Sequence, residues 1–423
     1  MPPSERAGTA PATAAVLPAA ASGRGKAWLF ALPDFRRLWL IGLVVFAVRW
    51  LEMLVVGVFV YERTGSAFQV ALMTLLRMAP MVIFGPLIGA YVERMERRYA
   101  QVFVSLSMLA TAIAVAGLAY AGRLEVWHLG LAAFCNGIAW AADNPVRRVM
   151  IGEVVGPERM GSAMAVDVGA NNASQMLGPM IGGLVLSNFG IAGAFTISVT
   201  CYAVAVISAL RLRHHNNVAP VAGGAVLGPI IEGLLLARRD KRLVGVLTIT
   251  VTYNIFGWPF TSLIPVIGQD SLHLAPGGIG TLASMTGVGS FFGAVAIALW
   301  ARHRHFTRLF VGAVLSYLTV MMAVALAPEA FLAGAALLAT GLANSGFSVM
   351  QATLIYLAAP AEMRSRLYGV LSLCIGSGLI GFMNIGLMAE WIGATHATVV
   401  SGIEGLAVMA LTWRWWRQIG SAG

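Results

Sequence analysis

The chain has 423 residues, of which 58% are hydrophobic and only 11% are charged, whereas soluble domains carry about 25% charged residues. This composition suits a surface covered by lipid and excludes a water-soluble domain as the main body of the protein. The formal net charge of +10 does not indicate nucleic-acid binding, because the basic residues lie in short clusters between apolar runs.

Residues 1–33 come first, and we expect them to form a disordered cytoplasmic tail. Residues 1–26 are rich in Ala, Pro, Ser and Gly, and they lack the compact apolar segment of a signal peptide. A weak amphipathic membrane anchor is the alternative interpretation of this segment.

Twelve apolar segments follow, each long enough to cross a membrane as a helix, which takes roughly 20 residues. Six precede a polar gap and six follow it, at 38–61, 68–92, 99–121, 127–146, 162–186, 192–210, 243–268, 278–300, 306–326, 331–357, 367–389 and 396–415. We therefore predict an all-α membrane protein with two six-helix bundles. The expected divisions are a bundle at 34–213, a linker with an amphipathic helix at 214–242, a second bundle at 243–417 and a cytoplasmic tail at 418–423.

The positions of the basic residues predict how these segments are oriented. If the N-terminus is cytoplasmic, nearly all of the 28 Lys and Arg residues fall in tails and loops on that side. Only Arg63 and Arg123 fall in the opposite loops, and only Arg49 and Arg77 fall within the segments. Cytoplasmic loops of membrane proteins carry an excess of Lys and Arg. We therefore predict that both termini are cytoplasmic.

The two halves show weak internal similarity. Residues 85–94 align with 293–302, at the end of the second segment of each half, and residues 157–160 resemble 361–364. Two repeated halves are typical of secondary transporters. A receptor or a membrane enzyme would not need this arrangement.

Three charged residues inside the predicted segments form the main candidate site. Arg49 and Glu52 are three residues apart and so share one face of a helix. At 1.5 Å per residue, Arg77 in the second segment lies at a similar depth. Charges in a membrane are costly and often functional, so we predict a cluster that handles substrate or protons. A structural ion network is the alternative, and the surplus arginine favours an anionic or hydroxyl-rich substrate.

Polar residues within other segments are candidates for lining a central cavity. Asp167, Asn171 and Gln175 share one helical stripe with two glycines in the fifth segment. Hydrogen bonding between helices is the alternative, and Asp167 could instead pair with Arg147 or Arg148. In the second half, Asn254, Trp258 and Pro259 predict a broken seventh segment. The cavity-lining candidates of that half are Asn254, Trp258, Asn344, Gln351 and Asn384.

Residues 89–98 read GAYVERMERR and resemble the loop signature of the major facilitator superfamily, G-x-x-x-D-R-x-G-R-R. Two departures are Glu93 in place of Asp and Glu96 in place of Gly. The resemblance implies a gating loop whose acidic residue faces a helix N-terminus and whose arginines pair with an acid of the fourth segment, here Asp143. The positions carried over are Gly89, Glu93, Arg94, Arg97, Arg98 and Asp143. Ordinary cytoplasmic positive charge is the alternative.

Two further patterns refine this resemblance. Residues 178–183 read GPMIGG and resemble the G-P-x-x-G-G signature of antiporters, here Gly178, Pro179, Gly182 and Gly183. The fourth-segment signature keeps Gly137, has Asn136 at the Gln position and lacks the Arg. Residues 35–39 and 144–183 look most like the subfamily of the bacterial enterobactin exporter and the macrolide efflux proteins. Asn136 is a further candidate for lining the cavity.

The sequence contains no phosphate-binding loop of the Walker type and no H-E-x-x-H or G-x-S-x-G motif. We therefore expect no enzyme activity, no cofactor and no metal site. The expected function is proton-coupled efflux of a small amphiphilic or anionic molecule, such as a siderophore-like metabolite or a drug. An uptake permease and a non-transporting sensor or scaffold are the alternatives. The expected partners are the lipid bilayer, a small-molecule substrate and protons, for a monomer in the bacterial inner membrane.

Overall fold

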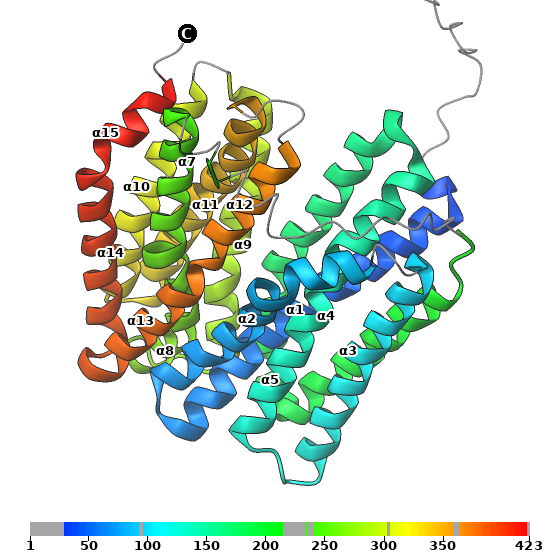
Figure 1. Ribbon diagram of the computed structural model, residues 1–423. Coiled ribbons are helices and arrows are strands. Elements are labelled where there is room, and N and C mark those ends of the chain that lie inside the picture. The colour runs from blue at the N-terminus through cyan, green and yellow to red at the C-terminus, as the bar shows by residue number, and fades with distance from the viewer. Residues whose placement is uncertain are drawn as a thin grey trace, which may run out of the picture.

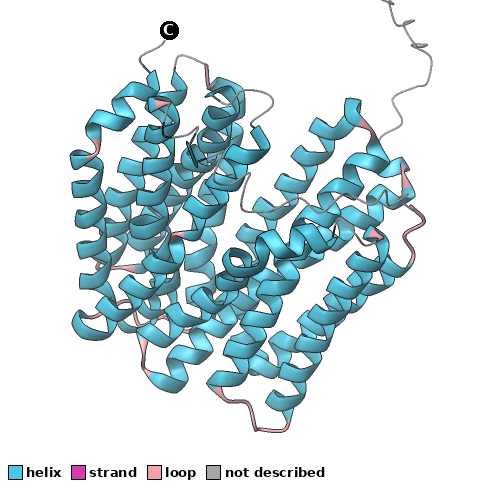
Figure 2. Cartoon of the chain, in the orientation of Figure 1, coloured by secondary structure: helices cyan, strands magenta, loops and turns pink. Residues whose placement is uncertain are grey.

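The computed structural model describes residues 29–92, 96–214, 240–302, 305–358 and 364–420, together with 234, 235 and 238. Side chains are described within these ranges except at 85–92, 157, 364–366, 368 and 420. In the described ranges the chain is helical apart from short connections, and the helices form two groups (Figures 1 and 2). Most of the predicted linker and its amphipathic helix lie outside the described residues.

The first group contains five long helices, α1 to α5. They are α1 (Pro33–Thr64), α2 (Ala67–Val92), α3 (Arg97–Tyr120), α4 (Val126–Val155) and α5 (Met160–Leu210), with short 3-10 turns at Leu29–Ala31 and Pro157–Arg159. Gly190 interrupts α5 with a φ of 64°, a backbone conformation that glycine adopts without steric cost. α5 therefore contains both the fifth and the sixth predicted segments.

The second group contains the remaining helices. They are α7 (Lys241–Thr252), η3 (Tyr253–Gly257), η4 (Trp258–Leu263), α8 (Ile264–Asp270), α9 (Pro276–Trp300), α10 (Phe306–Ala325), α11 (Ala330–Ala358), α12 (Arg364–Gly376), α13 (Gly378–Ile392), α14 (Ala394–Leu411), α15 (Trp413–Trp416) and η7 (Arg417–Gly420). The π-helical η3 and the 3-10 helical η4 confirm that the seventh segment is broken. Pro259 lies at this break and supplies no backbone N–H for a regular helix.

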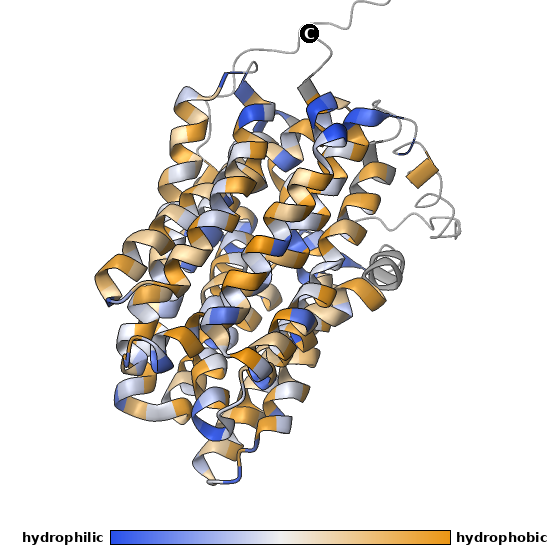
Figure 3. Ribbon diagram, turned by 90° about the vertical axis from the view of Figure 1, so that its left-hand side faces the viewer, coloured by the Kyte–Doolittle hydropathy of each residue, from blue (hydrophilic) through white to orange (hydrophobic). Residues whose placement is uncertain are grey.

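Ten helices in the described part of the chain are long and apolar enough to cross a membrane. α5 is one of these and holds two predicted segments, whereas α4, which carries Asn136, Asp143 and Arg147, is not among the ten. With α4 added and α5 divided at Gly190, each of the twelve predicted segments has its helix. Large apolar residues are exposed on the outside of both groups, as on α3 and α9, and hydrophobic residues run along most of the helices in Figure 3.

The two groups approach each other through two pairs of helices. α5 packs along α9, and α2 packs along α13. The groups meet at the end of the molecule that holds Thr64 and Asp270, which we call the Thr64 end. They diverge toward the opposite end, which holds Pro33 and the C-terminus and which we call the Pro33 end (Figure 1).

Candidate functional site

A cavity lies between the two groups of helices. Its walls come from α1, α2, α4 and α5 on one side and from η4, α8 and α9 on the other. On α1 the lining residues lie within 50–57, so the cavity lies nearer the Thr64 end. Most of the lining is apolar, and its charged, amide and larger aromatic side chains are Trp50, Glu52, Arg77, Asn136, Gln175 and Phe195.

Glu52 and Arg77 form an ion pair at this cavity. Arg77 Nη2 lies 3.5 Å from Glu52 Oε2, and Asn136 Nδ2 donates a hydrogen bond of 3.3 Å to the same oxygen. The carboxyl group is almost fully buried, with 2% exposure. Its second oxygen, Oε1, is left without a hydrogen bond among the described residues. The predicted proximity of Glu52 and Arg77 is therefore present, and the Ser198 hydroxyl also approaches the carboxyl group.

Arg49 does not join this ion pair. Its guanidinium group lies over the ring of Trp140, 3.9 Å from the ring centroid, and it makes no ion pair with Glu52 or any other described acid. Arg49 and Glu52 both belong to α1, three residues apart, as predicted. A planar aromatic surface on α4 gives the guanidinium group another partner, and this surface could not be read from spacing on α1.

The predicted stripe on α5 divides between two environments. Gln175 lines the cavity, and Asn171 accepts a hydrogen bond of 3.4 Å from the indole N–H of Trp50. Asp167 is buried away from the cavity and pairs with both Arg147 and Arg148. The prediction that Asp167 lines the cavity is therefore wrong, and the alternative of pairing with these arginines is correct.

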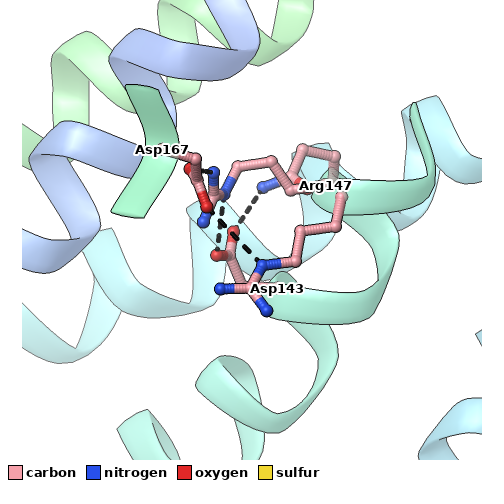
Figure 4. A network of polar contacts seen from close by, with 5 residues as sticks. Asp143, Arg147 and Asp167 are labelled. Atoms are coloured by element: carbon pink, nitrogen blue, oxygen red, sulfur yellow. Dashed lines mark hydrogen bonds and ion pairs between the residues drawn. The ribbon is translucent and has the colours of Figure 1, made fainter. Parts of the chain in front are cut away.

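Asp143, Arg147 and Asp167 form a buried charge network between α4 and α5 (Figure 4). Arg147 Nε lies 3.3 Å from Asp143 Oδ2, and Nη1 contacts Asp167 Oδ1. Gln101 on α3 donates a hydrogen bond of 2.7 Å to Asp143. Arg147 has no exposed surface, and a Cβ at Gly42 would lie only 2.6 Å from its Cζ atom. The absence of a side chain at this position of α1 therefore makes room for the guanidinium group.

The expected partner of the loop arginines is different in the structure. Arg97 forms an ion pair with Glu153 near the end of α4, whereas Asp143 contacts Arg147 and Gln101. The prediction for Asp143 is wrong because Asp143 lies deeper in the bundle, where Arg147 neutralises it. Arg98 donates a hydrogen bond to the Leu210 carbonyl. Gly89 belongs to α2, and Glu93 and Arg94 lie outside the described residues.

Most polar candidates of the second group join helices to each other. Asn344 on α11 accepts a hydrogen bond of 2.7 Å from Tyr253 and donates one of 3.2 Å to Ser290. Gln351 donates to Thr250 at 2.9 Å. The predicted cavity role of Asn344 and Gln351 is therefore replaced by packing between helices.

The three other candidates of this group also do not line the main cavity. Asn254 is buried and donates its amide to a backbone carbonyl of its own helix. Trp258 packs edge-on against Phe382 and borders a smaller apolar cavity between α2 and α13. Asn384 is half-buried on α13, outside the lining of the main cavity.

The GPMIGG segment of α5 touches two helices. Gly178 and Gly182 face α1, where a Cβ would meet Trp50 or Leu51. Gly183 faces α9, where its Cβ would lie 2.9 Å from the Cα of Gly280. Glycines on both helices allow the backbones to approach closely. This segment therefore belongs to a contact between the two groups of helices.

Side chains at the Thr64 end also join the two groups, and none of them is predicted from the sequence. Tyr61 donates a hydrogen bond to Asp270, Ser66 donates one of 2.8 Å to Glu390, and the backbone N–H of Gly277 donates one of 2.9 Å to Ser187. These residues lie at helix ends, far apart in sequence. No spacing pattern relates them, because their proximity results from the packing of the two groups.

The chain matches the sequence model of the Major Facilitator Superfamily over residues 38–416. It is 22% identical to macrolide efflux protein A of Streptococcus pyogenes over 351 residues, which cover 81% of this chain and 85% of that protein. It is 25% identical to the multidrug efflux pump Tap of Mycolicibacterium fortuitum, covering 85% and 88%. Its structure resembles a bacterial homologue of the human lysosomal transporter Spinster, crystallised inward-facing and unoccupied. That similarity has a TM-score of 0.72 and 16% identity and covers 91% of this chain and 97% of the other.

Proposed function

Because the chain belongs to the Major Facilitator Superfamily of membrane transporters, we propose that it exports a small amphiphilic molecule and couples export to proton influx through Glu52. The single observation that carries this proposal is the central cavity, where a buried ion pair of Glu52 and Arg77 meets mostly apolar walls. Pockets with apolar walls and a few polar groups are suited to amphiphilic ligands.

Two findings favour export over uptake. Relatives that cover most of the chain are named as efflux proteins for macrolides or for several drugs, so a macrolide is one candidate substrate. The GPMIGG segment resembles the antiporter signature, and it lies where α5 contacts α9. Uptake of a small metabolite and a non-transporting sensor or scaffold remain the competing functions.

We place the Pro33 end in the cytoplasm of a bacterial cell, with the protein in the inner membrane as a monomer. The concentration of basic residues in the loops of that end supports this orientation. The hydrogen bonds of Tyr61, Ser66 and Ser187 close the opposite end. The described conformation would then be the one that accepts substrate from the cytoplasm.

In this proposal, proton coupling depends on the protonation state of Glu52. As a carboxylate, Glu52 neutralises Arg77 at 3.5 Å. As a neutral acid it would release Arg77, and its O–H would need a nearby acceptor; the free Oδ1 of Asn136 is one such atom. Exchange between these two states would change the charge at the cavity when the protein changes conformation.

The experiment compares Glu52→Gln with wild type in proteoliposomes loaded with erythromycin, a macrolide. We expect a pH gradient, acidic on the side of the Thr64 end, to drive transport by wild type and not by Glu52→Gln. Counterflow without a gradient should persist in both, since glutamine leaves the cavity intact. Glu62→Gln is the matched control, because Glu62 lies on the same helix but is exposed.

Three results would reject parts of this proposal. Gradient-driven transport by Glu52→Gln equal to wild type would rule out coupling through Glu52. Transport in the opposite direction relative to the gradient would support uptake. Absence of counterflow for wild type with erythromycin and with the other compounds of a drug and metabolite panel would support the sensor or scaffold.

A further inference from the structure

α1 and α4 run in opposite directions, and their contacts form successive layers. Glu52 meets Asn136 in one layer, Arg49 lies over Trp140 in the next, and Gly42 faces Arg147 in a third. Arg49 is three residues from Glu52, so its layer lies about 4.5 Å closer to the Pro33 end. Arg49 therefore lies between the cavity and the buried charge network.

The layers on either side of Arg49 contain matched charges. Their ion pairs within 4 Å are Glu52 with Arg77, Asp143 with Arg147, and Asp167 with Arg147 and Arg148. In the network, the negative charges of two acids are thus matched by the positive charges of two arginines. At the cavity, the negative charge of one acid is matched by one arginine. Arg49 alone in this set has no acidic partner among the described residues. A cation inside a membrane protein usually has such a partner or lines a polar path.

Trp140 stabilises Arg49 without neutralising it. An aromatic ring attracts a guanidinium group through its electron-rich face, but it accepts none of the five N–H bonds in the usual way. Arg49 is also partly exposed. It does not line the main cavity itself, but it directly precedes Trp50, which does. Its donors therefore lie beside the cavity, and a guanidinium group pairs best with a planar anion through two parallel hydrogen bonds.

We propose that Arg49 is a specificity-determining residue that binds the carboxylate, or a similar anionic group, of an amphiphilic substrate. The ring of Trp50, which lines the cavity, provides aromatic surface for the apolar body of that molecule. This inference rests on the proposed transport function, and it predicts that anionic amphiphiles bind more tightly than neutral ones or cationic ones such as erythromycin. Neutral and cationic amphiphiles lack the group that would neutralise Arg49.

Binding of three dansyl compounds to the purified full-length protein tests the proposal. Dansylglycine is anionic, dansylamide is neutral and dansylcadaverine is cationic, and all three share one fluorophore. Energy transfer from tryptophan to dansyl reports binding without requiring transport. We expect wild type to bind dansylglycine at least about tenfold more tightly than dansylamide, since a hydrogen bond between charged groups is worth that ratio.

The variants distinguish the loss of the positive charge at position 49 from a loss of the folded structure. Arg49→Gln should lose the preference for dansylglycine, whereas Arg49→Lys should keep part of it because the charge remains. Arg63→Gln is the matched control, because Arg63 also stacks on a ring of α1, that of Phe59, but is exposed at the Thr64 end. Size-exclusion profiles and melting temperatures would confirm that each variant is folded.

Several outcomes would overturn the proposal. They are a wild type that does not bind dansylglycine or prefers another compound, an Arg49→Gln variant with unchanged preference, and an equal loss in Arg63→Gln. Failure of gradient-driven transport would not produce these results, because binding is measured without a gradient. The two proposals therefore fail by different observations.

Discussion

Arg147 is a fully buried guanidinium group that joins α4 to α5 through two carboxylates. Its hydrophobic surroundings include the ring of Phe46, 5.0 Å from Cζ, and the glycine at position 42. A buried ion pair does not by itself add much stability, but removal of one partner leaves the others buried and uncompensated. We therefore assign this network to the integrity of the first group of helices.

Replacement of Arg147 by Met should lower the free energy of unfolding by about 3–5 kcal/mol, because Asp143 and Asp167 lose their shared counterion. Thermal melting in detergent measures the effect. Arg148→Gln should have a much smaller effect, since the Arg148 side chain is 46% exposed and exposed ion pairs contribute little. Equal melting temperatures for Arg147→Met and wild type would contradict the structural role.

The depth of each residue in its predicted segment was enough to place Glu52 beside Arg77. This depth can be calculated from the residue number, because the rise per residue of an α-helix is constant. It was insufficient for Arg49 and Asp143. The partner of Arg49 is Trp140 of α4, which depends on the faces through which α1 and α4 meet, and a spacing pattern on one helix carries no information about that rotation. The partner of Asp143 is Arg147, four residues later on the same helix, a spacing that favours such a pair.

α5 and α9 form the closest contact between the two groups of helices. Gly183 and Gly280 face each other, and a Cβ on Gly280 would lie 3.0 Å from the Cα of Gly183. A contact between backbones leaves no flexible side chain to move aside. We expect this pair to define how closely the groups can approach at the Thr64 end.

Gly280→Ala should hold the groups apart and reduce transport, at a cost in packing of about 1–3 kcal/mol. Counterflow in proteoliposomes gives the transport rate. Gly312→Ala on α10 is the control, because a Cβ there has open space around it. Transport at the wild-type rate by both variants would contradict this role of the contact between Gly183 and Gly280.

Sequence patterns predicted the helices themselves and the irregular seventh segment. Long apolar runs identify membrane helices, and Pro259 marks an interruption. The patterns did not predict that Tyr253–Gly257 forms a π-helix, nor that Asn344 and Gln351 bond to neighbouring helices. Those features depend on how α11 packs against the seventh segment, which local composition does not specify.

For the molecule as a whole, the hydrogen bonds at the Thr64 end hold the two groups together. Tyr61 and Ser66 belong to the first group, and Asp270 and Glu390 belong to the second. Their removal should favour a conformation that is open at this end. We expect these pairs to set the balance between the two conformations.

The double variant Tyr61→Phe with Glu390→Gln should increase the reactivity of a cysteine at position 186 toward a maleimide. The reason is that Leu186 is buried in a cluster that includes Ile279 of the other group, and this position would become exposed when the groups separate. Glu329→Gln serves as the control, since Glu329 lies in a connection within the second group. Unchanged labelling of the double variant would show that these hydrogen bonds do not hold this end closed.

Distances between spin labels test the central claim of proton-linked alternating access most directly. Cys135, Cys201 and Cys374 are free thiols and would be replaced first. One label pair, at positions 64 and 273, spans the two groups at the Thr64 end, and another, at 210 and 301, spans them at the Pro33 end. From pH 8 to pH 5, we predict that the first distance increases while the second decreases, and that Glu52→Gln abolishes this response. Distances that stay constant, or that change in the same direction at both ends, would contradict the account.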